Sequence, residues 1–241
     1  MPAPFYTGER SAVVERLAAD FQSEATRALA ARGTFAVALP GGSVATQTFS
    51  TLAGLPIDWS GVHFFWADER AVPPSDPESN YAAAEALWLG PARVPAASIH
   101  RMPADQEDLN SAADLYAREL TDVLGVGARL DYVLLGVGPD GHVASLFPRA
   151  DARLNERQLV AAVFDAPKPP ARRLTLTMTM LCRAERLAVA AFGEAKAVVL
   201  SRVIRDPQSE LPLAEVLRCA PRPLVLADRP AAALVKAAKE G

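Results

Sequence analysis

The chain has 241 residues, of which 50% are hydrophobic and 22% are charged, and its formal net charge is −3. This composition is typical of a globular protein with a substantial core, and it gives no basic field that would attract nucleic acid or an anionic membrane. Two cysteines without a CxxC pair and three histidines argue against a zinc site and a disulfide framework, and they suit a reducing cytosol. The N-terminus has no apolar segment of signal-peptide or transmembrane length, so a cytoplasmic protein is expected.

The first half of the chain alternates between helical and strand patterns. Apolar residues spaced three or four apart indicate helices, which we place at 9–32, 44–53, 80–88 and 108–124. Short apolar runs indicate strands, which we place at 34–39, 62–66 and 97–102. Gly33 ends the first helix, and the Pro-rich loop VPPSDPES separates the second strand from the third helix.

The second half continues this alternation. Strands are expected at 130–135, 158–164, 186–192 and 224–228, and β-branched residues alternate through 172–180. Helices are expected at 143–147, 194–204 and 230–239. Strands that alternate with helices imply right-handed crossovers. The chain therefore predicts an α/β fold, a single-domain Rossmann-like α/β/α sandwich over 1–241 with a mainly parallel sheet.

The stretch 130–148, LDYVLLGVGPDGHVASLFP, carries the strongest chemical signal. Its apolar run is typical of a strand buried on both faces, and the run enters a glycine-rich turn that holds Asp140 and His142. Ligands of open α/β sheets bind at the carboxyl ends of such strands. Histidine accepts protons near neutral pH and a nearby carboxylate orients it, so His142 is a candidate general base. The alternative is an ordinary surface turn.

Two other predicted strands end in polar turns at the same edge of the sheet. Gly41, Gly42 and Ser43 open a helix whose free N–H groups favour an anion such as phosphate. As an alternative, Ser43 would be a simple N-cap. Asp68 and Arg70 follow the second strand, and an exposed ion-pair cluster is the alternative there.

Several cations lie at the ends of predicted elements, namely Lys168, Arg172, Arg173 and Lys196. Arginine binds a phosphate with two donors and lysine adds a point charge, although each of these residues would alone be a solvated surface group. His63 lies within an aromatic strand and is expected to be a packed core residue, and His100 has no evident partner.

Together these segments resemble the 6-phosphogluconolactonases, in the superfamily shared with glucosamine-6-phosphate deaminases and isomerases. The matching segments occur in the family's order and cover most of the chain: LPGGS at 39–43, FFWADERAVPPSDPESNY at 64–81, LDYVLLGVGPDGHVASLFP at 130–148, KPPARRLTLT at 168–177 and FGEAKAVVL at 192–200. The long central motif is specific, whereas GGS and the lysine motif are weak alone. Val44-Ala45 replace the family's usual Thr-Pro after the glycine loop, which removes one hydroxyl from the expected anion site.

The resemblance implies hydrolysis of 6-phosphoglucono-δ-lactone to 6-phosphogluconate in the oxidative pentose phosphate route, without a metal or a cofactor. His142 would be the general base and Asp140 would hold it. Asp68 would fix Arg70, which would orient the lactone or stabilise the oxyanion. The substrate phosphate would be bound by Gly41, Gly42, Ser43, Arg173 and Lys196. The expected partner is thus a small phosphorylated sugar lactone and neither nucleic acid nor membrane, and the oligomeric state is left open.

Two alternatives remain. A hexose-phosphate isomerase or deaminase needs acid–base groups for ring opening, and the deaminases supply one through an Asn-Glu-Pro segment after GHxA. This chain reads Ser145-Leu146-Phe147-Pro148 there, without a Glu. A non-catalytic sugar-phosphate sensor would carry a DNA-binding module, for which the predicted N-terminal helix leaves no room.

Overall fold

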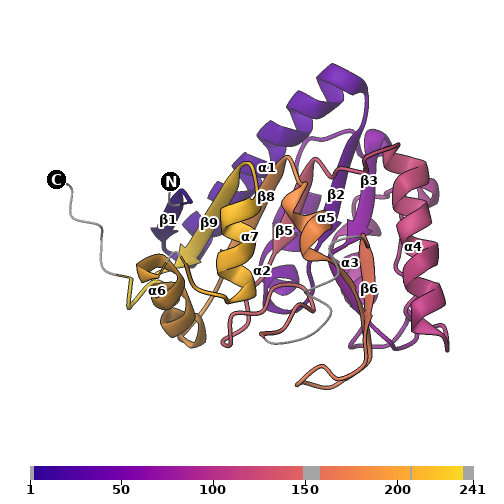
Figure 1. Cartoon of the computed structure of the whole chain (residues 1–241). Helices are drawn as coiled ribbons and strands as arrows, with labels where there is room; N and C mark the ends of the chain where they lie inside the picture. Colours follow the sequence, from indigo (N-terminus) through magenta and orange to yellow (C-terminus); the bar gives the residue numbers. More distant parts are fainter. Residues whose placement is uncertain (1–2, 149–157, 207, 236–241) are drawn as a thin grey trace.

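A six-stranded parallel sheet forms the centre of the computed structural model, which describes residues 3–148, 158–206 and 208–235 (Figure 1). Its strands lie in the order β1-β9-β8-β5-β2-β3, and each neighbouring pair is parallel. The strands are β1 Phe5–Gly8, β2 Phe35–Leu39, β3 Val62–Trp66, β5 Tyr132–Leu135, β8 Arg186–Ala191 and β9 Pro223–Asp228. The predicted α/β fold with a mainly parallel sheet is confirmed.

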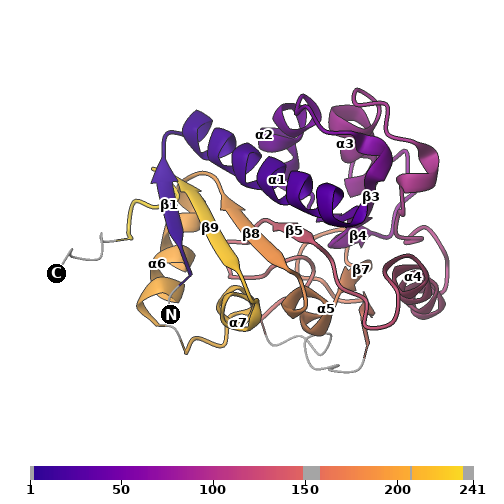
Figure 2. The same ribbon diagram turned by 90° about the horizontal axis from the view of Figure 1, so that it is seen from above.

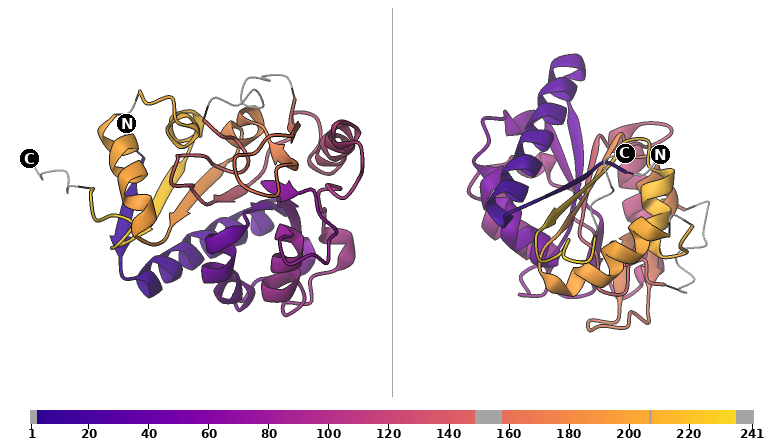
Figure 3. Two further views of the ribbon diagram at one scale, coloured as in Figure 1. Left: turned by 90° about the horizontal axis from the view of Figure 1, so that it is seen from below. Right: turned by 90° about the vertical axis from the view of Figure 1, so that its left-hand side faces the viewer.

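Helices cover both faces of this sheet, with α1, α2 and α3 on one face and α5, α6 and α7 on the other (Figure 2 and Figure 3). The helices are α1 Arg10–Arg32, α2 Gly42–Ala53, α3 Asn80–Ala84, α4 Leu109–Leu124, α5 Met178–Cys182, α6 Ala197–Arg205 and α7 Pro212–Cys219. Gly33 ends α1 in the left-handed conformation, as predicted. No helix in the described ranges is both long and apolar enough to span a bilayer.

A smaller antiparallel sheet, β4-β7-β6, lies beside the carboxyl end of the parallel sheet. Its strands are β4 Asp68–Arg70, β6 Val160–Val163 and β7 Arg173–Leu176, and α4 packs against β6 and β7. One residue separates the end of β3 from the start of β4, so the acidic residues that follow β3 belong to a second sheet. Asp68 and Glu69 are buried there, which excludes an exposed ion-pair cluster.

Some predicted elements differ from the observed ones. The expected strand at 97–102 is a short 3₁₀ turn, Ala96–Ser98, followed by one bridge between Phe64 and Ile99. The expected helix at 143–147 is a tight turn closed by a bridge between Val143 and Leu146. Residues 229–234 form turns where a closing helix was expected, and 236–239 lie outside the described residues. Strand β1 was missed because it is a half-buried edge strand with little apolar sequence.

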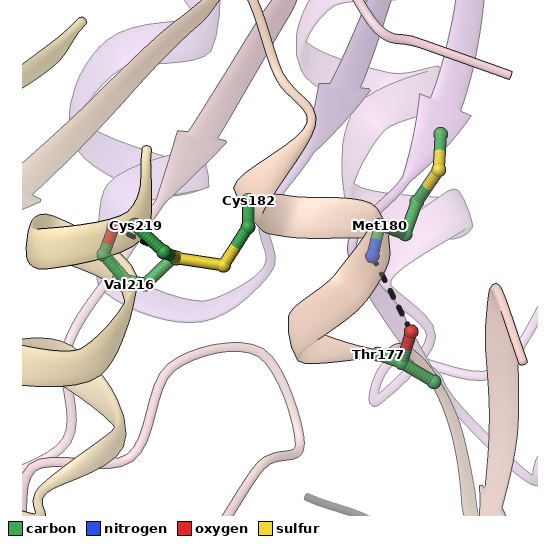
Figure 4. The surroundings of a disulfide bond; sticks show 5 residues. All are labelled: Thr177, Met180, Cys182, Val216 and Cys219. Carbon is green, nitrogen blue, oxygen red and sulfur yellow. Dashed lines mark hydrogen bonds between the residues drawn. A yellow bond between two sulfur atoms is a disulfide. The ribbon is translucent and has the colours of Figure 1, made fainter. Parts of the chain in front are cut away.

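The expectation of a chain without a disulfide is wrong, because Cys182 and Cys219 are bonded (Figure 4). The two cysteines end α5 and α7, and these helices pack against each other although 37 positions separate the cysteines. Their Cα atoms are 5.2 Å apart, inside the range that a disulfide requires. The spacing of the two cysteines in the sequence did not predict this bond. Because the cysteines are bonded, they no longer argue for a reducing compartment.

Removing this disulfide should lower the free energy of unfolding by about 2–4 kcal/mol, the scale expected for a closed loop of this length. The double variant Cys182→Ser/Cys219→Ser, compared with the oxidised wild type by urea unfolding, measures the difference. Wild-type protein treated with a reductant should match the double variant. An equal unfolding midpoint for oxidised and reduced protein would contradict the expectation.

Candidate active site

A cavity of about 240 Å³ lies at the carboxyl ends of β2 and β5. These strands are neighbours, but the chain continues from β2 to β3 on one side and from β5 to β8 on the other. The sheet therefore changes winding direction between them, and open α/β folds bind ligands at such a point. The turns after β2, β3, β5 and β8, the start of α3 and the hairpin from β6 to β7 line the cavity. Its lining residues are Pro40, Gly41, Gly42, Ser43, Val44, Ala67, Asp68, Arg70, Asn80, Leu135, Gly136, Val137, Gly138, Pro139, His142, Ala144, Phe147, Lys168, Pro169, Arg173 and Lys196.

The turn after β5 holds Asp140 against His142. Nδ1 of His142 is 2.6 Å from Oδ1 of Asp140, which leaves Nε2 as the imidazole nitrogen without this partner. The turn is closed by backbone hydrogen bonds from Gly138 N to His142 O (2.9 Å) and from Gly141 N to Gly138 O (3.0 Å). Gly141 has φ +90°, a conformation that a side chain would strain. Gly138 and Gly141 thus let the turn close tightly enough for the Asp140 carboxylate to contact Nδ1 of His142.

The surroundings favour the neutral form of His142. Burial lowers the pKa of this imidazole below its ordinary value of 6.5, and the neighbouring Asp140 carboxylate only partly offsets the effect. The Phe147 ring contributes to the burial, since its centroid is 4.6 Å from that of the imidazole. Burial would raise the pKa of Asp140, but the charge and hydrogen bonds of His142 lower it overall. At pH 7 the pair is therefore a neutral imidazole beside a carboxylate, as a general base requires.

Asp68 and Arg70 reach the cavity from β4. The Asp68 carboxylate is buried and accepts hydrogen bonds from Ser145 Oγ (2.6 Å) and Asn80 Nδ2 (3.3 Å). Arg70 donates from Nη1 to the carbonyl of Glu78 (2.6 Å). Its Nε is buried and has no hydrogen-bond partner among the described residues. A buried donor without a partner is costly, and the Arg70 side chain lines the cavity, so a ligand acceptor or a water molecule there would lower this cost.

Sequence reasoning missed Glu69 and Asn80. The buried Glu69 carboxylate accepts hydrogen bonds from the backbone N–H groups of Arg70, Asn80 and Tyr81 and from Ser79 Oγ, at 2.7–3.0 Å. Burial nevertheless raises the pKa of Glu69, because those hydrogen bonds only partly offset the desolvation. The carboxylate fixes the start of α3, which places Asn80 in the cavity wall beside Gly41. Only glycine fits there, since a Cβ on Gly41 would lie 1.8 Å from Asn80 Oδ1.

The candidate phosphate ligands come from the start of α2 and from two lysines that line the cavity. Helix α2 begins at Gly42, so its first N–H groups lie at the cavity wall, and Gly41, not Ser43, is the N-cap. Lys168 and Lys196 also line the cavity, and Lys196 is half-buried. Burial, and then the charge of Lys168, lowers the pKa of Lys196. Two ammonium groups close enough to repel each other are a favourable site for a dianion.

The two arginines of the KPPARRLTLT segment differ in position. Arg173 lines the cavity but is 5% exposed, and it donates from Nε to Pro170 O (2.9 Å) and from Nη2 to Lys168 O (3.0 Å). Arg173 therefore holds the hairpin that carries Lys168, and few of its donors are left for a ligand. Arg172 lies outside the cavity lining and donates to Glu107 O (2.6 Å).

The other two histidines lie outside this cavity. His63 Nδ1 is 3.0 Å from His100 Nε2, and His100 Nδ1 is 2.9 Å from Glu119 Oε1. His100 therefore has two partners, which its neighbours in the sequence did not indicate. His63, expected to be a packed core residue, is partly buried beside it. Within the described residues, no group of three His, Cys, Asp or Glu side chains is arranged to hold a metal ion.

Comparison with known proteins shows the family of the chain. The family model described as glucosamine-6-phosphate isomerases/6-phosphogluconolactonase matches residues 8–224. The chain belongs to this family. It is 37% identical over 193 residues to the 6-phosphogluconolactonase of Mycobacterium tuberculosis, covering 76% of this chain and 78% of that protein. The crystal structure of the Thermotoga maritima 6-phosphogluconolactonase superposes with a TM-score of 0.83 at 26% identity, over 94% of this chain and 99% of that one.

A longer relative is the human GDH/6PGL endoplasmic bifunctional protein, 36% identical over 227 residues. The match covers 89% of this chain and 28% of that protein, so the chain spans less than a third of its length. Phe147 lies in the segment that follows the turn of His142. Here its ring packs on His142 and lies 5.6 Å from the Arg173 guanidinium carbon. Phe147 therefore shields His142 at this wall of the cavity.

Proposed function

We propose that the chain is a 6-phosphogluconolactonase that hydrolyses 6-phospho-D-glucono-1,5-lactone to 6-phospho-D-gluconate in the oxidative pentose phosphate pathway. The observation that carries the proposal is His142, held by Asp140 at 2.6 Å in a cavity that Arg70 also lines, where burial favours the neutral imidazole. A lactone is an activated ester, so a base and an oxyanion donor suffice for its hydrolysis. The names of relatives above 30% identity support the same reaction.

In the proposed mechanism, His142 Nε2 takes a proton from a water molecule as the water oxygen attacks C1 of the lactone. Asp140 stabilises the imidazolium through Nδ1. The carbonyl oxygen becomes an oxyanion that accepts a hydrogen bond from Arg70, whose Nε is otherwise unused. The tetrahedral intermediate then collapses, the bond from C1 to the ring oxygen breaks, and the imidazolium returns its proton to that oxygen. Asp68 accepts hydrogen bonds from Ser145 and Asn80, and its charge favours the imidazolium of His142.

The sugar phosphate would lie between the N-terminus of α2 and the two lysines. Gly41, Gly42 and Ser43 supply backbone donors there, and Lys168 and Lys196 supply charge. We assign Lys168 to this site in addition to the residues expected from the sequence. Arg173 would contribute mainly by holding the Lys168 hairpin.

The remaining sequence expectations complete the proposal. The 241 residues would act as one lactonase domain, with a small phosphorylated lactone as the partner and neither nucleic acid nor membrane. No cofactor is required by the mechanism. A cytoplasmic location remains part of this proposal, although the Cys182–Cys219 disulfide removes the argument from the cysteines.

One assay distinguishes the lactonase from its alternatives. Purified protein should accelerate loss of the 6-phosphorylated lactone above spontaneous hydrolysis, and it should release no ammonia from glucosamine 6-phosphate. Ammonia release at a comparable rate would favour the deaminase. Binding of the lactone without turnover would favour a sugar-phosphate sensor.

Replacing Lys196 with Met should raise KM for the phosphorylated lactone about tenfold to hundredfold, with kcat changed much less. The phosphate is bound in the ground state and the transition state alike, and a charged hydrogen bond contributes about 1.5–3 kcal/mol. Arg172→Met is the matched control, because Arg172 is a nearby cation outside the cavity lining. Equal KM values for the two variants would remove Lys196 from the phosphate site.

A further inference from the structure

Ser145 joins the turn after His142 to the antiparallel sheet. Its side chain is 0% exposed, and its Oγ donates to Asp68 Oδ2 at 2.6 Å. The same oxygen accepts a hydrogen bond from Arg173 Nη1 at 3.4 Å. The backbone N–H of Ser145 donates to Thr175 Oγ1 at 3.2 Å. One buried serine therefore contacts both β4 and β7.

The backbone around Ser145 is shaped for this position. Ala144 has φ +48°, an uncommon conformation for a residue with a side chain, and Val143 and Leu146 close the turn with a bridge. Asp68 and Thr175 are paired in register across β4 and β7. The turn thus inserts the serine at one defined point of that pairing.

The hydroxyl separates two opposite charges. Arg173 Nη1 is 4.0 Å from Asp68 Oδ2, while Ser145 Oγ bonds to both groups. Both charged side chains are buried, so a direct ion pair between them would be strong if they closed together. Without the hydroxyl, Asp68 would either move onto Arg173 or keep a buried oxygen without a donor.

The position of Asp68 affects the proposed base. Burial lowers the pKa of His142, and the charges of Asp140 and then Asp68 act in the opposite direction. A carboxylate neutralised by Arg173 would no longer favour the imidazolium that forms during proton transfer. Ser145 itself is excluded as a nucleophile, because it does not line the cavity and already donates its proton to Asp68.

We propose that Ser145 is a positioning residue of the lactonase site, whose hydroxyl holds the Asp68 carboxylate apart from Arg173 and in place beside His142. The inference rests on the proposed lactonase function and assigns a role to a residue that never meets the substrate. It also gives a chemical reason for a serine at this point of the turn.

Ser145→Ala should lower kcat about tenfold to hundredfold and leave KM within about threefold, because the loss lies in transition-state stabilisation. The acid limb of the pH–rate profile should move to lower pH, since Asp68 no longer raises the pKa of His142. Ser201→Ala is the matched control: Ser201 is another buried serine, and its hydroxyl donates to Leu234 O. This control should keep the wild-type kcat and acid limb.

A double-mutant cycle tests whether Ser145 acts through Asp68. In an Asp68→Asn background, Ser145→Ala should cause little further loss of kcat. Should Ser145→Ala not fold by thermal melt, Ser145→Cys, which keeps a similar volume but only a weak donor, replaces it in the same cycle. Additive losses, or a wild-type acid limb in the folded variant, would overturn the proposal. A wild-type protein without lactonase activity would instead refute the proposed function, which separates the two failures.

Discussion

Replacing His142 with Asn should lower kcat for the phosphorylated lactone by about 10²–10⁴-fold, with a much smaller change in KM. Asn keeps a polar side chain of similar reach but accepts no proton near neutral pH, so the loss falls on the transition state. The remaining activity would come from substrate positioning and from the Arg70 donor. Rates measured after correction for spontaneous hydrolysis give the comparison.

The wild-type pH–rate profile gives an independent test of the same residue. The base works only when neutral, so the rate should fall as the pH drops through the pKa of His142. Burial lowers that pKa, which places the acid limb below pH 6.5. His63→Asn is the control, because His63 lies outside the cavity, and it should leave both the rate and the limb unchanged. A folded His142→Asn protein with most of its kcat would remove His142 as the base.

Replacing Gly138 with Ala should lower kcat by about 10²-fold or more. A Cβ at this position would lie 2.1 Å from Cε1 and Nδ1 of His142 and 2.5 Å from Oδ1 of Asp140. Such contacts are too short to exist, so the imidazole and the carboxylate would have to move. Misplacing a catalytic group by about 1 Å can cost a factor of 10² in rate.

Gly54→Ala is the matched control for this glycine. Gly54 ends α2 with φ −81°, and a Cβ there would meet only ordinary contacts at 3.6 and 3.9 Å. Thermal melts of both variants separate displacement of the base from a general loss of stability. A stable Gly138→Ala protein with wild-type kcat would show that the close approach of this glycine to His142 is not needed for catalysis.

The central strands and the turns that follow them could be predicted from the sequence. The run Tyr132–Leu135 has no polar residue, and all four of its residues are buried in the sheet. Glycine, proline and aspartate then specify the turn that holds His142, because their conformational preferences are local. The glycine loop before α2 and the polar residues that follow β3 could be placed at the same edge of the sheet, since the carboxyl ends of parallel strands lie together. Their residues do line one cavity.

The partner of each polar group, in contrast, depends on the packing of the whole fold. Arg173 lines the cavity, and its hydrogen bonds to the hairpin carbonyls of Lys168 and Pro170 could not be predicted from the sequence. Cys182 and Cys219 are bonded because α5 and α7 pack together, and Ser145 lies beside Asp68 because a turn after β5 reaches β4. The periodicity of apolar residues indicates which face of an element is buried. The disulfide and the hydrogen bond from Ser145 to Asp68 instead join residues 37 and 77 positions apart. Such pairings depend on how the two sheets and the helices pack, which no local pattern in the sequence encodes.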